Sequence, residues 1–258
     1  MGGEQEEQLE GGNVTRVARR GDAVHRASGP WTPAVHALLR HLEARGFTRS
    51  PRVLGFDEEG REVLTFIHGP PTSQDQFPPA LLELDGVATL GRVIRELHDA
   101  VADFDPGEAE YRVGRRSVGA GEVVCHGDLG YWNTVWDGDQ LVGLIDWDFA
   151  EPGPPVGELA VSAMSVVPFR DDAWAGSVGF QAAPDRRLRL GALCDAYGGV
   201  SPIEVVGAAE RVVGSEQEKL RTLGEQGLEP WASNLANGQA RLFETLAAWI
   251  DANRNTLT

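Results

Sequence analysis

Short apolar segments separated by glycine turns open the chain. Residues 9–27 alternate β-forming side chains with two breaks, at Gly11-Gly12 and at Gly21-Asp22. Because glycine and aspartate end strands at turns, this pattern predicts three short strands. Residues 52–69 place two apolar runs around an acidic glycine turn and predict a hairpin.

Between these strands the apolar spacing becomes helical. Thr32 is the expected N-cap, Pro33 the first helical residue and Gly46 the stop signal. One face of this helix carries Val35, Leu38, Leu39 and Leu42. Residues 1–68 are therefore predicted to form three strands, one helix and two further strands.

A proline-rich polar stretch at residues 69–79 predicts a connection between two parts of the chain, 1–68 and 69–258. Just beyond it, apolar residues recur at helical spacing between Val87 and Phe104. We expect one long helix there, ending near Asp105-Pro106.

The rest of the C-terminal part is predicted to be mostly helical. Residues 105–121 are expected to be an irregular loop, and the apolar runs within 123–146 are too short for anything but strands. Helices dominate the remainder, one opened by a capping box of Ser201 and Glu204 and the last starting near residue 231. The pattern as a whole predicts an α+β fold.

Composition narrows the classes of function. The 258 residues include 23 Lys and Arg against 39 Asp and Glu, a formal net charge of −16. This balance argues against a nucleic-acid binder and is compatible with a cationic small-molecule partner. Cys125 and Cys194 form no metal motif and favour a reduced, cytoplasmic protein. We expect no signal peptide and no membrane segment, because the acidic start and the rest of the chain lack a long apolar run.

The candidate chemistry lies in two short motifs, HGDLGYWN at 126–133 and LIDWD at 144–148. Asp128 and Asn133 occur in a loop, and Asp146 closes an apolar strand. Carboxylate and amide oxygens are hard ligands that suit Mg²⁺, and a further carboxylate can take a proton from a hydroxyl. His126 has no partner histidine at a metal-binding spacing and is expected to brace the loop.

Other interpretations of these aspartates remain open at this point. Asp and Asn are common in hairpin turns, so any one of them alone is typical of turn chemistry. A metal-dependent hydrolase with a two-metal carboxylate site is a second possibility. The joint pattern of acid, amide and strand-ending acid favours phosphoryl transfer over both.

The two motifs together resemble the catalytic loop and metal motif of the aminoglycoside phosphotransferase superfamily, whose members share the protein-kinase fold. LGRVIRELHD at 90–99 is similar to the helix before that loop, and VHRASGPWTPAVHALLRHLEARGF resembles the trifolitoxin-immunity-type subgroup. The resemblance implies a bilobal fold, with a small five-stranded N-lobe that carries one helix and a larger, mostly helical C-lobe.

The resemblance also implies site roles. It makes Asp128 the catalytic base with His126 beside it, and Asn133, Asp146 and Asp148 the magnesium ligands. Residues implied at the nucleotide, through the glycine loop, the third strand and the hinge, are Gly11, Gly12, Val24, Arg26, Phe66 and His68.

One departure from the family affects the phosphate site. Kinases of this fold hold phosphate with a lysine on the third strand, but Lys219 is the single lysine of this chain. Arg26 shares a strand face with Val24 and is the expected substitute. The paired glutamate of the helix is also missing, with His36 nearest its place and Glu43 two turns late.

These features predict a Mg²⁺-dependent kinase that moves the γ-phosphate of ATP or GTP to a hydroxyl of a small molecule, such as an aminoglycoside-like antibiotic or a metabolite. The alternative is a catalytically weak immunity or binding protein that sequesters a toxic peptide or metabolite.

Overall fold

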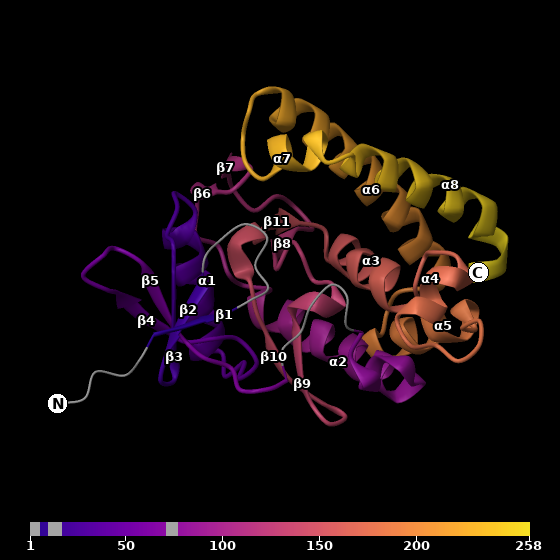
Figure 1. Cartoon of the computed structure of the whole chain (residues 1–258), viewed down its shortest axis with the longest axis horizontal. Coiled ribbons are helices and arrows are strands. Elements are labelled where there is room, and N and C mark those ends of the chain that lie inside the picture. The colour runs from indigo at the N-terminus through magenta and orange to yellow at the C-terminus, as the bar shows by residue number, and fades with distance from the viewer. Residues whose placement is uncertain (1–5, 10–16, 71–76) are drawn as a thin grey trace.

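A five-stranded antiparallel sheet lies at the N-terminal end of the chain (Figure 1). The computed structural model describes residues 6–9, 17–70 and 77–258. Within this described part, the strands follow the spatial order β1-β2-β3-β5-β4. Their bounds are β1 (Glu7–Leu9), β2 (Val17–Arg20), β3 (Ala23–Arg26), β4 (Val53–Phe56) and β5 (Glu62–Thr65). The predicted sequence of three strands, a helix and two strands is confirmed.

Helix α1 (Thr32–Ala44) joins β3 to β4 and buries the four predicted apolar residues against the core. The prediction that Thr32 is its N-cap is wrong. Trp31 occupies the cap position, and the Thr32 hydroxyl oxygen accepts a hydrogen bond from the Gly29 N–H at 2.9 Å. The hydroxyl therefore closes the turn before the helix, because the Thr32 backbone is already helical.

Helices make up most of the remaining described chain. They are α2 (Leu84–Val101), α3 (Pro155–Val166), α4 (Asp172–Ser177), α5 (Arg186–Tyr197), α6 (Pro202–Glu225), α7 (Trp231–Ala236) and α8 (Gln239–Leu257). α2 packs on α5, and α6 packs on α3, α7 and α8. The capping box predicted at Ser201 and Glu204 opens α6. Short 3-10 turns complete this part: η1 (Pro79–Leu82), η2 (Tyr131–Asn133) and η3 (Trp147–Phe149).

Three sequence predictions in this part are wrong in detail. The stretch expected to be an irregular loop holds a hairpin of β6 (Ala109–Tyr111) and β7 (Gly114–Arg116). α2 ends at Val101, earlier than the expected end near Asp105-Pro106. The last predicted helix is two helices, α7 and α8, because Gly238 adopts a left-handed conformation between them.

Small antiparallel pairs carry the two motifs. β8 (Val123–Cys125) pairs with β11 (Glu151–Gly153), and β9 (Thr134–Asp137) pairs with β10 (Gln140–Leu144). The strands predicted within 123–146 are thus present. One apolar core runs from α1 through α2 to α3, α5 and α6, and Trp136 and Trp147 are buried in it.

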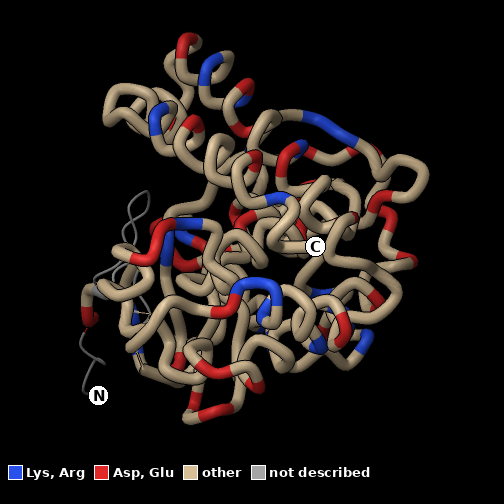
Figure 2. Tube along the Cα trace, turned by 90° about the vertical axis from the view of Figure 1, so that its right-hand side faces the viewer, with Lys and Arg blue, Asp and Glu red and all other residues tan. Residues whose placement is uncertain are grey.

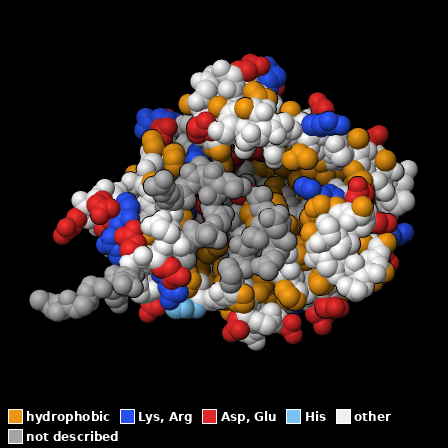
Figure 3. Space-filling model, in the orientation of Figure 1, with side chains coloured by type: hydrophobic (Ala, Val, Ile, Leu, Met, Phe, Trp, Pro, Cys, Tyr) orange, Lys and Arg blue, Asp and Glu red, His pale blue; other side chains and the backbone are white. Residues whose placement is uncertain are grey.

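The surface charge is spread widely. Figure 2 shows Asp and Glu residues along most of the described trace rather than in a single segment. In Figure 3, charged side chains lie mostly around the outline of the view, whereas exposed apolar side chains gather over the helical part. In the part of the chain that the structure describes, no helix combines the length and apolarity needed to cross a membrane.

Candidate active site

The two motifs lie side by side because of local strand pairing. β8 leads into the HGDLGYWN loop, and its partner β11 follows the LIDWD segment after two intervening residues. The Ile145 N–H also donates to the Asn133 carbonyl oxygen at 3.0 Å. Residues twelve positions apart in sequence are therefore fixed against each other by backbone hydrogen bonds, and the side chains that follow share one site.

Gly127 allows the loop to pass close to the second motif. Its φ of +84° is in the left-handed region, and a Cβ atom there would lie 1.9 Å from the Phe149 carbonyl oxygen. Only glycine meets both conditions without displacing the backbone. The next residue, Asp128, is thereby held against the segment that carries Asp146.

Asp128 is partly buried and receives two side-chain hydrogen bonds. Its Oδ2 accepts from Asn133 Nδ2 at 3.0 Å and from Trp132 Nε1 at 3.3 Å. Burial, and then the negative charge of Asp146, raise the pKa of Asp128 to about 7 against the lowering effect of these hydrogen bonds. A carboxyl with this pKa exchanges protons readily near neutral pH.

Asn133 is fixed with its amide nitrogen toward the loop. Nδ2 also donates to the Asp128 carbonyl oxygen at 2.7 Å, so the side-chain amide is bonded to both the backbone and the carboxylate of one residue. This orientation presents Oδ1 as the oxygen of Asn133 that can coordinate a cation.

Asp146 has an unusual backbone. Its φ of 62° and ψ of 67° are left-handed, and among the described residues it is the one non-glycine residue with positive φ. Such a conformation costs about 1–3 kcal/mol and is maintained where the surroundings require it. The side chain is 45% exposed, in contrast to that of Asp148, which is 6% exposed.

Arg26 reaches this cluster from the sheet. Its Nη2 lies 3.2 Å from Asp146 Oδ1 and also contacts Asp148 Oδ2. Its Nε lies 3.0 Å from Glu62 Oε1, and Glu62 is its cross-strand neighbour on β5. Burial lowers the pKa of Arg26, but the carboxylates of Asp148, Asp146 and Glu62 outweigh that effect and raise it, so the guanidinium remains charged.

Glu62 lies between Arg26 and a histidine of helix α1. Its Oε2 lies 2.9 Å from Nε2 of His36. His36 is the α1 residue nearest the position where the family has its paired glutamate. Both side chains are 3% exposed. The helix therefore connects to Arg26 through a strand carboxylate instead of directly.

A second arginine was missed by sequence analysis. Arg112, in the turn of the β6–β7 hairpin, directs Nη1 to Asp148 Oδ2 at 3.2 Å. Its guanidinium lies between two rings, 4.3 Å from the centre of Trp31 and 4.8 Å from that of Phe149. Asp148 thus contacts two guanidinium groups.

The buried side chain of His126 holds the loop backbone in place. His126 Nε2 donates to the Ile145 carbonyl at 2.9 Å, and its Nδ1 lies 3.4 Å from the Asp128 backbone nitrogen, which donates to it. Burial lowers the pKa of His126, which favours the neutral ring that this arrangement requires.

A second buried network holds the same loop. His98 on α2 bonds the Tyr197 hydroxyl and Glu158, each at 2.9 Å, and the other oxygen of Glu158 accepts from the Gly127 N–H at 2.9 Å. Cys125 completes a group of three potential metal ligands with His98 and Glu158. The histidine and the carboxylate already use their ligand atoms in hydrogen bonds, so we interpret this group as a brace.

Charged residues of α6 also act on the loop region. The negative charge of Glu216 contributes to the raised pKa of Asp128. Lys219, one turn further on, donates to Glu151 Oε1 at 2.7 Å and to Glu216 Oε1 at 2.9 Å. These contacts join α6 to β11, shortly after the second motif.

The nucleotide-site predictions have different outcomes. Gly11 and Gly12 lie outside the described residues. Phe66 and His68 lie beside the β2–β3 turn, where the Arg19 guanidinium stacks 4.1 Å from the Phe66 ring and His68 contacts Asp22 at 2.9 Å. Val24 is paired with Leu64 across the sheet, two residues before Arg26. These nucleotide roles remain predictions.

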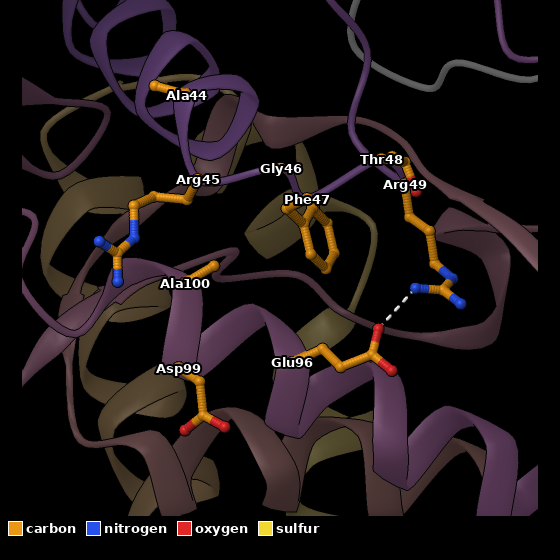
Figure 4. Close-up of a pocket in the computed structure, with 9 residues that line it drawn as sticks. All are labelled: Ala44, Arg45, Gly46, Phe47, Thr48, Arg49, Glu96, Asp99 and Ala100. Atoms are coloured by element: carbon orange, nitrogen blue, oxygen red, sulfur yellow. Dashed lines mark hydrogen bonds and ion pairs between the residues drawn. The ribbon is translucent and has the colours of Figure 1, made fainter.

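Two surface pockets lie away from the motifs. Figure 4 shows one between the end of α1 and α2, where Arg49 and Glu96 form an ion pair at 2.6 Å. The other lies between α5, α6 and the start of α3. Neither is lined by Asp128, Asn133 or Asp146.

Comparison with known proteins identifies the family. Residues 115–191, which contain both motifs, match the phosphotransferase enzyme family. The trifolitoxin immunity protein of Rhizobium leguminosarum bv. trifolii is 41% identical over 202 residues, covering 74% of this chain and 73% of that protein. The chain belongs to the phosphotransferase enzyme family. The predicted similarity to the trifolitoxin-immunity-type subgroup is confirmed.

The fold of this chain is similar to that of solved kinase structures. Amicoumacin kinase hAmiN, in complex with AMP-PNP, Ca²⁺ and Ami, matches with a TM-score of 0.60 at 12% identity, covering 95% of this chain and 88% of that one. A choline/ethanolamine kinase family protein from Mesorhizobium loti matches with a TM-score of 0.56 at 22% identity, covering 98% and 87%. The predicted kinase-like α+β fold is confirmed.

Proposed function

We propose that this family member transfers the γ-phosphate of ATP or GTP to a hydroxyl group of a small molecule, with Mg²⁺ as cofactor. The observation that carries the proposal is the convergence of Asp128, Asn133 and Asp146 through the paired motifs. The domain division made from sequence, 1–68 for nucleotide and 69–258 for catalysis and acceptor, is part of this proposal.

The donor set fits a magnesium ion. Asn133 Oδ1 and the half-exposed carboxylate of Asp146 are hard oxygen ligands, and the strained backbone of Asp146 is the kind of distortion found at functional sites. Asp148 was also predicted as a ligand. Both arginines contact its Oδ2, so Oδ1 is the atom that we assign to the ion. Bound there, the ion supplies charge neutralisation for the phosphate oxygens.

Asp128 is the proposed base. The acceptor hydroxyl oxygen forms a bond to the γ-phosphorus while the bond from that phosphorus to the bridging oxygen of the diphosphate breaks. The hydroxyl proton passes to Asp128, whose pKa of about 7 suits this transfer. Asn133 and Trp132 orient the carboxylate, and His126 and Glu158 hold the loop backbone.

Arg26 is the proposed phosphate-binding residue. A guanidinium can form two parallel hydrogen bonds to phosphate oxygens, which a lysine cannot do. Arg26 is held by carboxylates, so nucleotide binding requires its Nη2 to exchange Asp146 and Asp148 for a phosphate oxygen while Glu62 stays beside its Nε.

A second candidate function is binding without turnover. The 41% identical relative is an immunity protein by name. The contacts of Arg26 with three carboxylates favour this alternative too, because they oppose its release to phosphate. In that case the protein sequesters a toxic peptide or metabolite.

Calorimetry with ATP and GTP, with and without Mg²⁺, followed by phosphate-transfer assays against hydroxylated antibiotics and metabolites, tests the proposal. We expect Mg²⁺-dependent nucleotide binding and a phosphorylated product in the wild type, and binding without product in Asp128→Ala. Full turnover in Asp128→Ala excludes Asp128 as the base. Nucleotide binding without turnover on any acceptor favours the second candidate.

Arg26 is tested by two substitutions. Arg26→Ala is expected to weaken nucleotide binding or turnover by about 2–3 kcal/mol, as for a lost charge-assisted hydrogen bond. Arg26→Lys is expected to recover only part, since the planar fork is lost. If both variants match the wild type, Arg26 does not hold the phosphates.

The acceptor and location follow from the same proposal. The net charge of −16 suits a cationic acceptor. ATP, GTP and Mg²⁺ as substrates and cofactor imply a cytoplasmic site of action.

A further inference from the structure

Arg112 is a charged side chain buried among aromatic rings at the metal motif. Its side chain is 6% exposed, and its guanidinium is stacked between Trp31, which precedes α1, and Phe149, which follows Asp148. Burying a guanidinium is costly unless its charge is paired, and Asp148 supplies the pair at 3.2 Å. The sequence places this cation in the turn of a short hairpin.

The charges around Asp148 are not balanced one to one. Arg26 and Arg112 provide two positive charges, while Glu62, Asp146 and Asp148 provide three negative ones. Both arginines contact the same oxygen, Asp148 Oδ2. If one arginine leaves, the other still neutralises Asp148.

We propose that Arg112 is a positioning residue for the nucleotide site: it holds Asp148 so that Arg26 can turn from that carboxylate to a nucleotide phosphate. This inference rests on the proposed function, because it requires a phosphate ligand for Arg26. Without Arg112, Arg26 would be the remaining described cation in contact with Asp148 and would be held there more strongly.

Contacts other than those of Arg112 also hold the hairpin in place. At the end of β7, Arg116 binds Glu151 at 2.9 Å and Glu122 at 3.3 Å, and Glu151 is held in turn by Lys219 of α6. β6 also packs against α1 (Figure 1). Because these contacts anchor the hairpin, the charge in its turn is available for a role at the site.

Arg112→Met tests the role of the charge. An unbranched methionine side chain can fill the space between the two rings while removing the cation. The matched control is Arg115→Met on the same hairpin, where Arg115 is 64% exposed and pairs with Glu110. Calorimetry with Mg²⁺ and AMP-PNP, or the corresponding GTP analogue, measures affinity. We expect about a tenfold or greater loss for Arg112→Met and none for Arg115→Met.

The Asp148→Asn background separates positioning from direct contact. With the carboxylate gone, Arg26 is no longer held by it, so adding Arg112→Met to Asp148→Asn is expected to change affinity less than twofold. An equal loss in both backgrounds overturns the proposal and assigns Arg112 to the phosphate itself.

Two further results distinguish failure of this inference from failure of the proposed function. Wild-type affinity in Arg112→Met overturns the inference, whereas absence of nucleotide binding in the wild type overturns the proposed function. Arg112→Lys covers the case in which Arg112→Met does not fold. It retains the charge and is expected to keep more affinity than a neutral Arg112→Gln variant. Equal affinity in those two variants contradicts the proposal.

Discussion

The buried position of Asp128 destabilises the folded state once its carboxyl group is ionised. Its folded-state pKa of about 7 lies above its ordinary value of 3.8, mainly because of burial and then because of the nearby charge of Asp146. The folded state therefore binds the proton more tightly than the unfolded state. The stability that this proton contributes is fully present below pH 3.8 and is lost as the pH rises through about 7.

We expect Asp128→Asn to remove this pH dependence. In buffer containing EDTA, the variant should unfold at a higher temperature than the wild type at pH 8, by at least roughly 2–4 °C, the shift for about 1 kcal/mol in a domain of this size. At pH 5 the difference should shrink. Scanning calorimetry at both pH values measures it.

The exposed residue Asp137 supplies a control for that experiment. Asp137→Asn keeps the change in net charge but not the burial, so its unfolding temperature should follow that of the wild type at both pH values. A difference between Asp128→Asn and wild type that is the same at pH 5 and pH 8 contradicts the assigned pKa.

Single residues also show the limit of sequence reasoning at this site. Asp128, Asn133 and Asp146 were found because they occur at fixed offsets in two motifs. Glu62 was not, because its role depends on being opposite Arg26 across the sheet, a register that the alternation in EVLT does not specify. The sequence did hold one signal for Glu62: it lies on the same strand face as the apolar Leu64, where a carboxylate needs a buried partner.

At the scale of elements, apolar periodicity predicted the helices that have a buried apolar face. α1 and α2 were found from their buried stripes, and β4 and β5 from the glycine turn between them. The β6–β7 hairpin was missed because its strands are three residues long and mostly polar, with no alternation to detect. Arg112 could not be placed for the same reason.

The packing of α2 on α5 gives a prediction about glycine. A Cβ at Gly91 would lie 2.7 Å from the Leu193 carbonyl oxygen and 3.1 Å from the Ala196 Cβ. Backbone blocks the added methyl group, so the helices must separate. We expect Gly91→Ala to lower the free energy of unfolding by about 1–3 kcal/mol, measured by urea denaturation.

A second helical glycine provides the opposite result. Gly214 in α6 is exposed, and an added Cβ meets no atom within 4 Å. Gly214→Ala should raise the free energy of unfolding by about 0.5–1 kcal/mol, because alanine loses less conformational freedom in a helix. If the two substitutions act in the same direction, helix propensity rather than packing determines both.

At the scale of the molecule, the site joins two parts of the fold. Arg26 and Glu62 come from the N-terminal sheet, while Asp146 and Asp148 come from the region after β10. A ligand that contacts both sides binds only when they are assembled. Its binding free energy therefore adds to the stability of the folded chain.

We expect a Mg²⁺–nucleotide complex at about 100 times its dissociation constant to stabilise the protein by about 2.7 kcal/mol. Thermal unfolding with and without Mg²⁺ measures this. In Asp146→Ala the part of the shift that depends on Mg²⁺ should disappear. If Mg²⁺ raises the unfolding temperature of wild type and variant equally in the presence of nucleotide, Asp146 is not the ligand.

Chemical modification of Lys219 can report on the contact between α6 and β11. As the single lysine of the chain, it is the one side chain that an amine-acylating reagent can modify. Burial lowers its pKa, but the negative charges of Glu216 and Glu151, together with the hydrogen bonds to them, raise it above the usual value, so little free amine is present to react. Acylation of Lys219 should therefore be slow until α6 moves away from β11.

The rate of that acylation, followed by mass spectrometry, is then a measure of how often this side of the site opens. Glu151→Gln should accelerate it, whereas Glu218→Gln, which alters an exposed pair with Arg221 on the same helix, should not. An acceptor bound between α6 and the catalytic loop should slow the reaction, so covalent labelling can detect occupancy with compounds that are never phosphorylated.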